Sequence, residues 1–188
     1  MKEFLRILML VLLFAACKSP EPRRPVSQSS GSFIDRSIKH NKKLIAFEEN
    51  LIKEIIAEDT VHNYLTSQNG FWYYYNKKID SVAPTPDFGD QVVFEYNILQ
   101  LDGTPIYSSE EIPTRTYMMD KEDLITGLRQ GLKLMKAGET VTFLFPSYNA
   151  FGYYGDTNKI GSNVPIKSTV TLKSIKENSE IPLDTLTK

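Results

Sequence analysis

The stretch "LITGLRQGLKLMKAGETVTFLF", residues 124–145, joins a helical pattern to a strand pattern. Apolar residues first recur at spacings of three and four, which predicts a helix with one apolar face. That face is formed by Ile125, Leu128, Leu132 and Met135. Gly138 suits a left-handed helix end. From Val141 to Phe145 every second residue is strongly apolar, which indicates a strand.

Strand patterns flank this unit on both sides. Residues 71–78, "FWYYYNKK", are rich in aromatic side chains that suit a pleated sheet. Residues 91–98 alternate in hydrophobicity, and "LDGT", residues 101–104, is a turn signal between strands. The segment "STVTLKSI", residues 168–175, alternates again. One short helix among antiparallel strands predicts an α+β domain in which a sheet packs over the helix.

A long amphipathic helix is predicted for residues 33–59. Its apolar face holds Ile34, Ile38, Ile45, Phe47, Leu51, Ile52, Ile55 and Ile56, and its polar side holds Lys39, Lys42, Lys43, Glu48, Glu49, Lys53 and Glu54. Such a helix must bury its apolar face. The pattern leaves open whether that face packs on the following domain or on a second copy of the chain.

The N-terminus has the features of an export signal. Lys2 and Arg6 precede the apolar run of residues 7–16, which is too short for a bilayer span of about 20 residues. Cys17, the only cysteine, follows two alanines and resembles the lipid-modified cysteine of a bacterial lipobox, although Phe14 departs from the usual aliphatic residue. The alternative is a soluble secreted protein with an incidental cysteine.

The ionisable residues form no recognisable catalytic or metal-binding pattern. A net charge of −1 gives no electrostatic case for nucleic acid. His40 and His62 are isolated, and Asp156 opens a calcium-loop pattern whose last ligand position is Lys167. We therefore expect no metal, no cofactor and no catalytic acid, base or nucleophile.

The aromatic loop "SYNAFGYYG", residues 147–155, is interpreted as core packing, a base-stacking surface or the wall of an apolar pocket. A surplus of apolar residues without ionisable chemistry suits a reaction that transfers no proton. Rotation about a prolyl peptide bond is such a reaction, because its barrier of about 18–20 kcal/mol is lost amide resonance. The twisted amide carries less charge separation than the planar one, so an apolar pocket favours it.

Four blocks resemble the FKBP-type peptidyl-prolyl isomerases in order and spacing. They are "VVFEYNILQLDGTPIYSS" (92–109), "LITGLRQGLKLMKAGE" (124–139), "FPSYNAFG" (145–152) and "VPIKSTVTLKSI" (164–175). With the N-terminal features and the loop "AFGYYGDTNKIG", the chain is more narrowly similar to the gliding-motility-associated FKBP lipoproteins of Bacteroidetes.

The resemblance implies an antiparallel half-barrel sheet wrapped around the 124–136 helix, with a proline pocket between them. The implied pocket residues are Tyr96, Ile106, Leu124, Ile125, Leu128, Phe151, Val164 and Leu172. Ile125 would offer its backbone N–H to a substrate carbonyl, and Leu128 would form the floor. Tyr107 stands where many members have aspartate, and Phe151 where tyrosine is usual. Residues 110–117 match poorly, so no pocket residue is assigned there.

The expected organisation runs from an envelope anchor to an isomerase domain. Its parts are a signal peptide (1–16), a lipidated Cys17 with a Pro/Ser-rich tether (17–32), the helix and leading strand (33–86), the isomerase domain (87–177) and a tail (178–188). We expect proline-containing clients, a membrane contact through the lipid, no nucleic acid, and a homodimer through residues 33–59 as one possible assembly. Lys18 favours an outer-membrane lipoprotein facing the periplasm. The alternative function is a non-catalytic FKBP-fold chaperone or a structural part of an envelope machine.

Overall fold

The computed structural model describes residues 30–178. Its elements are α2 (Ser30–Glu58), β1 (Leu65–Thr66), β2 (Trp72–Lys77), β3 (Gln91–Tyr96), β4 (Ile98–Leu99), β5 (Pro105–Tyr107), β6 (Arg115–Met118), α3 (Thr126–Leu132), β7 (Thr140–Phe145), the 3-10 turn η1 (Ser147–Asn149) and β8 (Ile166–Lys176). The expected signal peptide, the expected lipidation site Cys17 and most of the expected tether and tail lie outside these residues. No helix within them is long and apolar enough to cross a bilayer. The chain divides into two compact units, and the division falls between Ile38 and Lys39, within the residues of α2.

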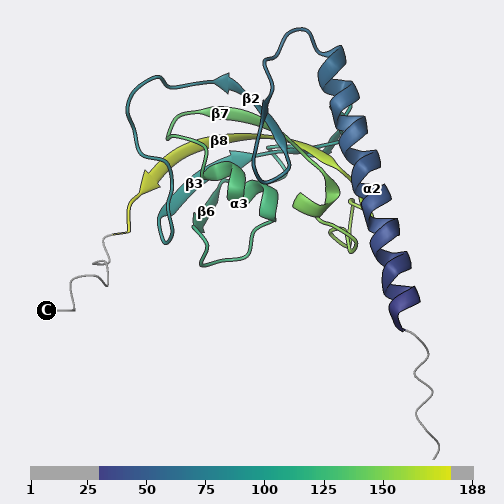
Figure 1. The fold of residues 1–188 in the computed structure, drawn as a ribbon. Coiled ribbons are helices and arrows are strands. Elements are labelled where there is room, and N and C mark those ends of the chain that lie inside the picture. The colour runs from purple at the N-terminus through teal and green to yellow at the C-terminus, as the bar shows by residue number, and fades with distance from the viewer. Residues whose placement is uncertain (1–29, 179–188) are drawn as a thin grey trace, which may run out of the picture. The chain divides into compact units, whose positions relative to one another are not determined.

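The second unit is built on an antiparallel sheet of eight strands (Figure 1). Six of them follow the order β1-β2-β7-β8-β3-β6, and the short β4 and β5 pair beside β8. α3 lies against one face of this sheet. The predicted α+β fold, an antiparallel sheet around one short helix with a long helix before it, is confirmed. The last strand, β8, holds a central place because it pairs with both β7 and β3.

The main core lies between α3 and the sheet. Leu128 and Leu132 of α3 are buried with the rings of Phe143 and Phe145, which stack with centroids 5.4 Å apart. Apolar burial of this kind is the principal stabilising contribution to the fold. The sequence predicted helical spacing as far as Gly138, but α3 ends at Leu132. Tight turns replace the last helical turn, while Met135 remains fully buried within them.

Two glycines let α3 approach the sheet closely. A Cβ atom at Gly127 would lie 2.5 Å from the Phe145 ring and 2.7 Å from the carbonyl oxygen of Asn149, and one at Gly131 would lie 2.9 Å from the Phe143 ring. Neither glycine has a positive φ, so the reason for glycine here is space and not backbone conformation.

The part of α2 from Lys39 onward packs on the other face of the sheet. Successive strand residues point to opposite faces, so Leu144 faces away from Phe143 and joins Trp72 and Ile52 in a second, smaller cluster. The sequence assigned Glu48 to the solvated side of this helix, and that prediction is wrong. Glu48 is only 2% exposed, because its carboxylate accepts hydrogen bonds from the backbone N–H and the hydroxyl of Ser147, each at 2.7 Å.

Candidate functional site

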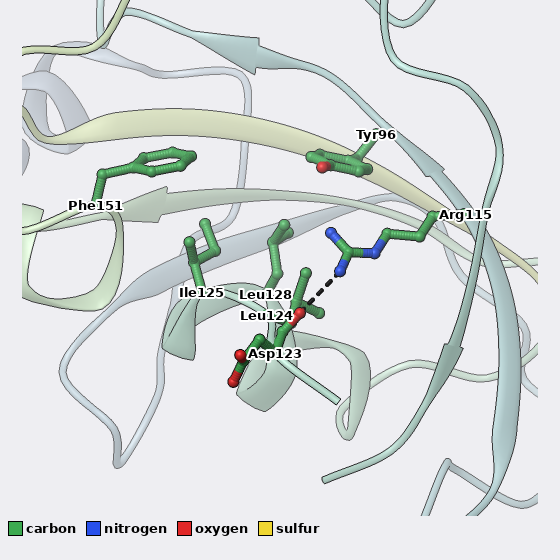
Figure 2. A pocket seen from close by; sticks show the side chains of 7 residues that line it. All are labelled: Tyr96, Arg115, Asp123, Leu124, Ile125, Leu128 and Phe151. Atoms are coloured by element: carbon green, nitrogen blue, oxygen red, sulfur yellow. Dashed lines mark hydrogen bonds between the residues drawn. The ribbon is translucent and has the colours of Figure 1, made fainter. Parts of the chain in front are cut away.

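A cleft of about 400 Å³ opens beside α3 (Figure 2). Its lining residues are Tyr96, Arg115, Asp123, Leu124, Ile125, Leu128 and Phe151. Tyr96 ends β3, Leu124 and Ile125 precede α3, Leu128 lies in the first turn of α3, and Phe151 follows η1. Five of the eight residues expected in a proline pocket are therefore brought together.

The cleft has an aromatic side and an aliphatic side. In Figure 2 the rings of Phe151 and Tyr96 lie along the strands, and the side chains of Ile125 and Leu128 rise from the α3 region opposite them. Leu128 is 1% exposed and joins the cleft to the core, whereas Tyr96 and Phe151 are half-buried. The slot between these groups is apolar and accessible, which suits a small apolar ring such as that of proline.

The backbone N–H of Ile125 has no hydrogen-bond acceptor among residues 30–178. The reason is its place at the N-terminal cap of α3, since the first N–H groups of a helix have no partner within the helix. It is a donor beside the apolar slot, as expected for a group that binds a substrate carbonyl.

The remaining three expected pocket residues lie elsewhere. Ile106 and Val164 line a second cavity of about 800 Å³, together with Leu51 and Ile55 of α2. Leu172 is fully buried in the core behind the cleft. These positions pack against the same core as the cleft residues but do not line it.

Sequence reasoning missed two polar lining residues, Arg115 and Asp123. One Nη atom of Arg115 donates a hydrogen bond to the backbone carbonyl of Asp123 at 2.8 Å, the dashed line in Figure 2. Strand alternation from the buried Tyr117 was the available signal, because residues 115 and 117 of one strand share a face. The poor match of residues 110–117 to the resembled family concealed it.

Tyr107, which stands where many members of the resembled family have aspartate, holds the loop that follows Phe151 in place. Its hydroxyl donates a hydrogen bond to Asp156, and that bond raises the pKa of Tyr107. Desolvation raises the pKa of Asp156, but this bond and those from the N–H groups of Asn158 and Ile160 lower it below its usual value. The ammonium of Lys159 lies 4.6 Å from the centre of the Tyr107 ring. A tyrosine thus anchors the 156–160 loop to β5.

The aromatic loop has divided roles. Phe151 lines the cleft, whereas the hydroxyl of Tyr148 donates to the carbonyl of Gly70 at 2.9 Å. Tyr153 and Tyr154 are 73% and 86% exposed and contact each other edge to face. Within the described residues, no group of three or more histidine, cysteine or acidic side chains is arranged to hold a metal ion.

Comparisons with known proteins agree with this geometry. The family model described as FKBP-type peptidyl-prolyl cis-trans isomerase matches residues 83–173. A probable FKBP-type peptidyl-prolyl cis-trans isomerase FkpA from Neisseria meningitidis is 31% identical over 134 residues, which are 71% of this chain and 47% of that protein. The chain thus spans about half the length of this relative.

Solved structures show the same fold at low sequence identity. FkpA from Escherichia coli is similar with a TM-score of 0.57 and 22% identity, over 93% of this chain and 82% of that chain. A peptidyl-prolyl cis-trans isomerase from Pseudomonas syringae pv. tomato is similar with a TM-score of 0.55 and 18% identity, over 70% of this chain and 96% of that chain.

Proposed function

Residues 83–173 are a domain of the FKBP-type peptidyl-prolyl cis-trans isomerase family, and from this premise we propose that the protein accelerates rotation about prolyl peptide bonds in clients of the cell envelope. The observation that carries the proposal is the apolar slot between Phe151, Tyr96 and Leu128, beside the N–H of Ile125, which has no acceptor within residues 30–178. No acid, base or nucleophile is needed for this reaction.

The geometry supports a mechanism of differential stabilisation. The proline ring enters the slot over Leu128, and the Ile125 N–H binds a carbonyl of the client and fixes its orientation. The twisted amide has less charge separation than the planar amide, so apolar walls favour it over the ground state. A hundredfold to ten-thousandfold acceleration requires about 3–5.5 kcal/mol of such preference.

The direct test is an isomerase assay with the full-length protein in detergent on short Leu-Pro peptides. We expect acceleration that Phe151→Glu abolishes, because a carboxylate in the half-buried cleft wall would have to be desolvated next to proline. Lys77→Glu, an exposed change on β2, is the matched control and should retain activity. Wild-type rates equal to the uncatalysed rate would refute the proposal.

For location, we propose that Cys17 is lipidated and holds the domain at the outer membrane on the periplasmic side. The support is the apolar run ending in two alanines before Cys17, followed by Lys18. Metabolic labelling with a fatty acid should mark the wild type and not Cys17→Ala. A setting in gliding motility rests on resemblance alone, and deletion of the protein from a gliding bacterium tests it.

For assembly, we propose a homodimer through α2. The support is a set of exposed apolar side chains on this helix, namely Phe33, Ile34, Ile38 and Phe47. A helix that leaves such residues in water gains by covering them. Sedimentation should show a dimer that Phe47→Ser weakens, and a monomeric mass at high concentration would count against it.

A non-catalytic chaperone is the second candidate. It is favoured by Phe151, which offers no hydroxyl to the cleft, and by the charged Arg115 in the cleft wall. Phe151→Glu, which should remove isomerase activity, separates the two functions. If this variant still suppresses client aggregation and restores the phenotype of a deletion strain, the protein acts chiefly as a chaperone.

A further inference from the structure

Arg115 places a positive charge in an otherwise largely apolar cleft. It is the first residue of β6 and shares a face with Tyr117, which is fully buried. A strand position that faces the core ordinarily holds an apolar side chain, and arginine is rarely found there without a paired charge. Figure 2 shows the guanidinium directed into the space between Tyr96 and Leu128.

The contacts that hold the guanidinium leave its charge unneutralised. They are the hydrogen bond to the backbone carbonyl of Asp123 and the ring of Tyr117, whose centre lies 6.0 Å from Cζ. Among residues 30–178, no carboxylate lies within ion-pair distance of Arg115. The carboxylate of Asp123 points away from it in Figure 2, and that of Glu95 is paired with Lys173 at 2.8 Å.

The guanidinium also retains hydrogen-bonding capacity. It carries five N–H donors in a planar fork that fits a carboxylate, and one described contact uses one of them. The bond to Asp123 and the half-buried position hold the fork in one orientation, which reduces the entropy lost when a ligand binds. Because the site is partly shielded from water, an incoming carboxylate is attracted more strongly than at an open surface.

We propose that Arg115 makes this cleft select clients with an aspartate or glutamate next to the proline. The inference rests on the proposed isomerase function, since the proline ring in the slot is what brings its neighbouring residue to β6. An apolar neighbour would meet the charged guanidinium, and a carboxylate would form a forked hydrogen-bonded pair with it. Arg115 is then a specificity-determining residue of the cleft.

The test uses two pairs of tetrapeptides, and the two members of each pair differ only in carrying glutamate or glutamine. This residue stands before proline in the first pair and after proline in the second. The full-length protein should show a kcat/KM about threefold to tenfold higher for glutamate in at least one pair at low salt. The preference should shrink at about 0.5 M salt, because the pair is only half-buried.

Three variants isolate the charge. Arg115→Gln retains a donor for the Asp123 carbonyl but should reduce the glutamate-to-glutamine ratio to about one. Arg115→Lys should keep part of the ratio, because it keeps the charge without the fork. Lys77→Gln removes an exposed charge from β2, near the other end of the strand order from β6, and should leave the ratio unchanged.

The outcomes separate this inference from the proposed function. Catalysis without a glutamate preference, or a preference that survives Arg115→Gln, overturns the role of Arg115 and leaves the isomerase intact. If no peptide is accelerated, the isomerase proposal fails. In that case the same pairs are compared by dissociation constants from titration, where an Arg115-dependent ratio supports the selectivity and a ratio of one refutes it.

Discussion

The two faces of the sheet receive their helices in different ways. The backbone of α3 packs directly on β7 at two glycines, where Gly127 lies against the ring of Phe145 and Gly131 against the ring of Phe143. α2 meets the opposite face through side chains, chiefly the buried Ile52 and the carboxylate of Glu48 on Ser147. Long side chains can adjust when a neighbour changes, whereas a backbone in van der Waals contact cannot.

The contact of α3 with the sheet determines how precisely the cleft is positioned, whereas the contact of α2 holds that helix on the sheet. Leu128 lies between the two glycines in the sequence, so the floor of the cleft is fixed by this close helix–sheet contact. α2 depends on a few side chains and one buried polar contact. We expect damage on the α3 face to unfold the domain, and damage on the α2 face to loosen one helix.

The largest expected effect comes from Gly127→Ala. The added methyl group would overlap the Phe145 ring and the Asn149 carbonyl, so the free energy of unfolding should fall by about 2–3 kcal/mol in spite of alanine's better helix propensity. Urea denaturation measures this. Gly161→Ala is the control, because its nearest atom would be 3.9 Å away, and it should change stability little. If the two variants were equally stable, close packing of α3 on the sheet would not be what distinguishes the two faces.

Glu48→Ala should have the next largest effect. It leaves the N–H and hydroxyl of Ser147 buried without an acceptor, which costs about 2 kcal/mol. Hydrogen exchange should show α2 losing protection while β7 and β8 keep theirs. Glu49→Ala removes a surface pair with Lys53 and an interaction with Tyr148, and should change stability by less than about 0.5 kcal/mol. Equal loss of protection in α3 would show that the two faces are not separable.

Phe151→Ala probes a cleft wall that belongs to neither helix. Removing the ring exposes the bound proline to water on one side, so kcat/KM should fall about tenfold, which corresponds to about 1.4 kcal/mol. The half-buried position predicts a smaller loss of stability. Tyr154→Ala, at an 86% exposed position of the same loop, should retain full activity. An unchanged rate for Phe151→Ala would remove this residue from the site.

The smallest effect concerns Asp59, just beyond α2. A hydrogen bond with His62 lowers the pKa of Asp59 well below its usual value, helped by the N–H of Val61. A lowered folded-state pKa stabilises the fold above the unfolded-state pKa of about 3.9, and this contribution is lost as the pH falls below it. Asp59→Asn should therefore be slightly less stable at pH 7 and should flatten the acid limb of the stability curve. Asp80→Asn, which removes an exposed loop carboxylate, is the matched control.

Periodicity predicted the elements because each has one well-defined apolar face. The spacing of apolar residues located both helices and the strands at 91–96, 140–145 and 166–176, and aromatic content located the strand at 72–77. The failures have local causes. α3 stops early because tight turns bury Met135 without a further helical turn. The burial of Glu48 was not predicted, because its partner Ser147 is 99 residues away in the sequence and no local pattern reports such a contact.

The candidate site, like the fold, contains residues that the sequence predicted and residues that it did not. Tyr96, Leu124, Ile125, Leu128 and Phe151 were predicted because their blocks match a known family, and the cleft contains them. Ile106 and Val164 face a second cavity instead. Arg115 and Asp123 were not predicted: residues 110–117 match the resembled family poorly, so only strand alternation from Tyr117 pointed to Arg115, and no sequence pattern pointed to Asp123.

The position of β8 bears on when the domain can form. Its partners β7 and β3 lie on either side of it, so the sheet has a gap at its centre until residue 176 has been synthesised. Long-range pairing of this kind slows folding, because the chain must close large loops before it gains contacts. We therefore expect the sheet of a nascent chain to remain incomplete until residues 166–176 have emerged from the ribosome.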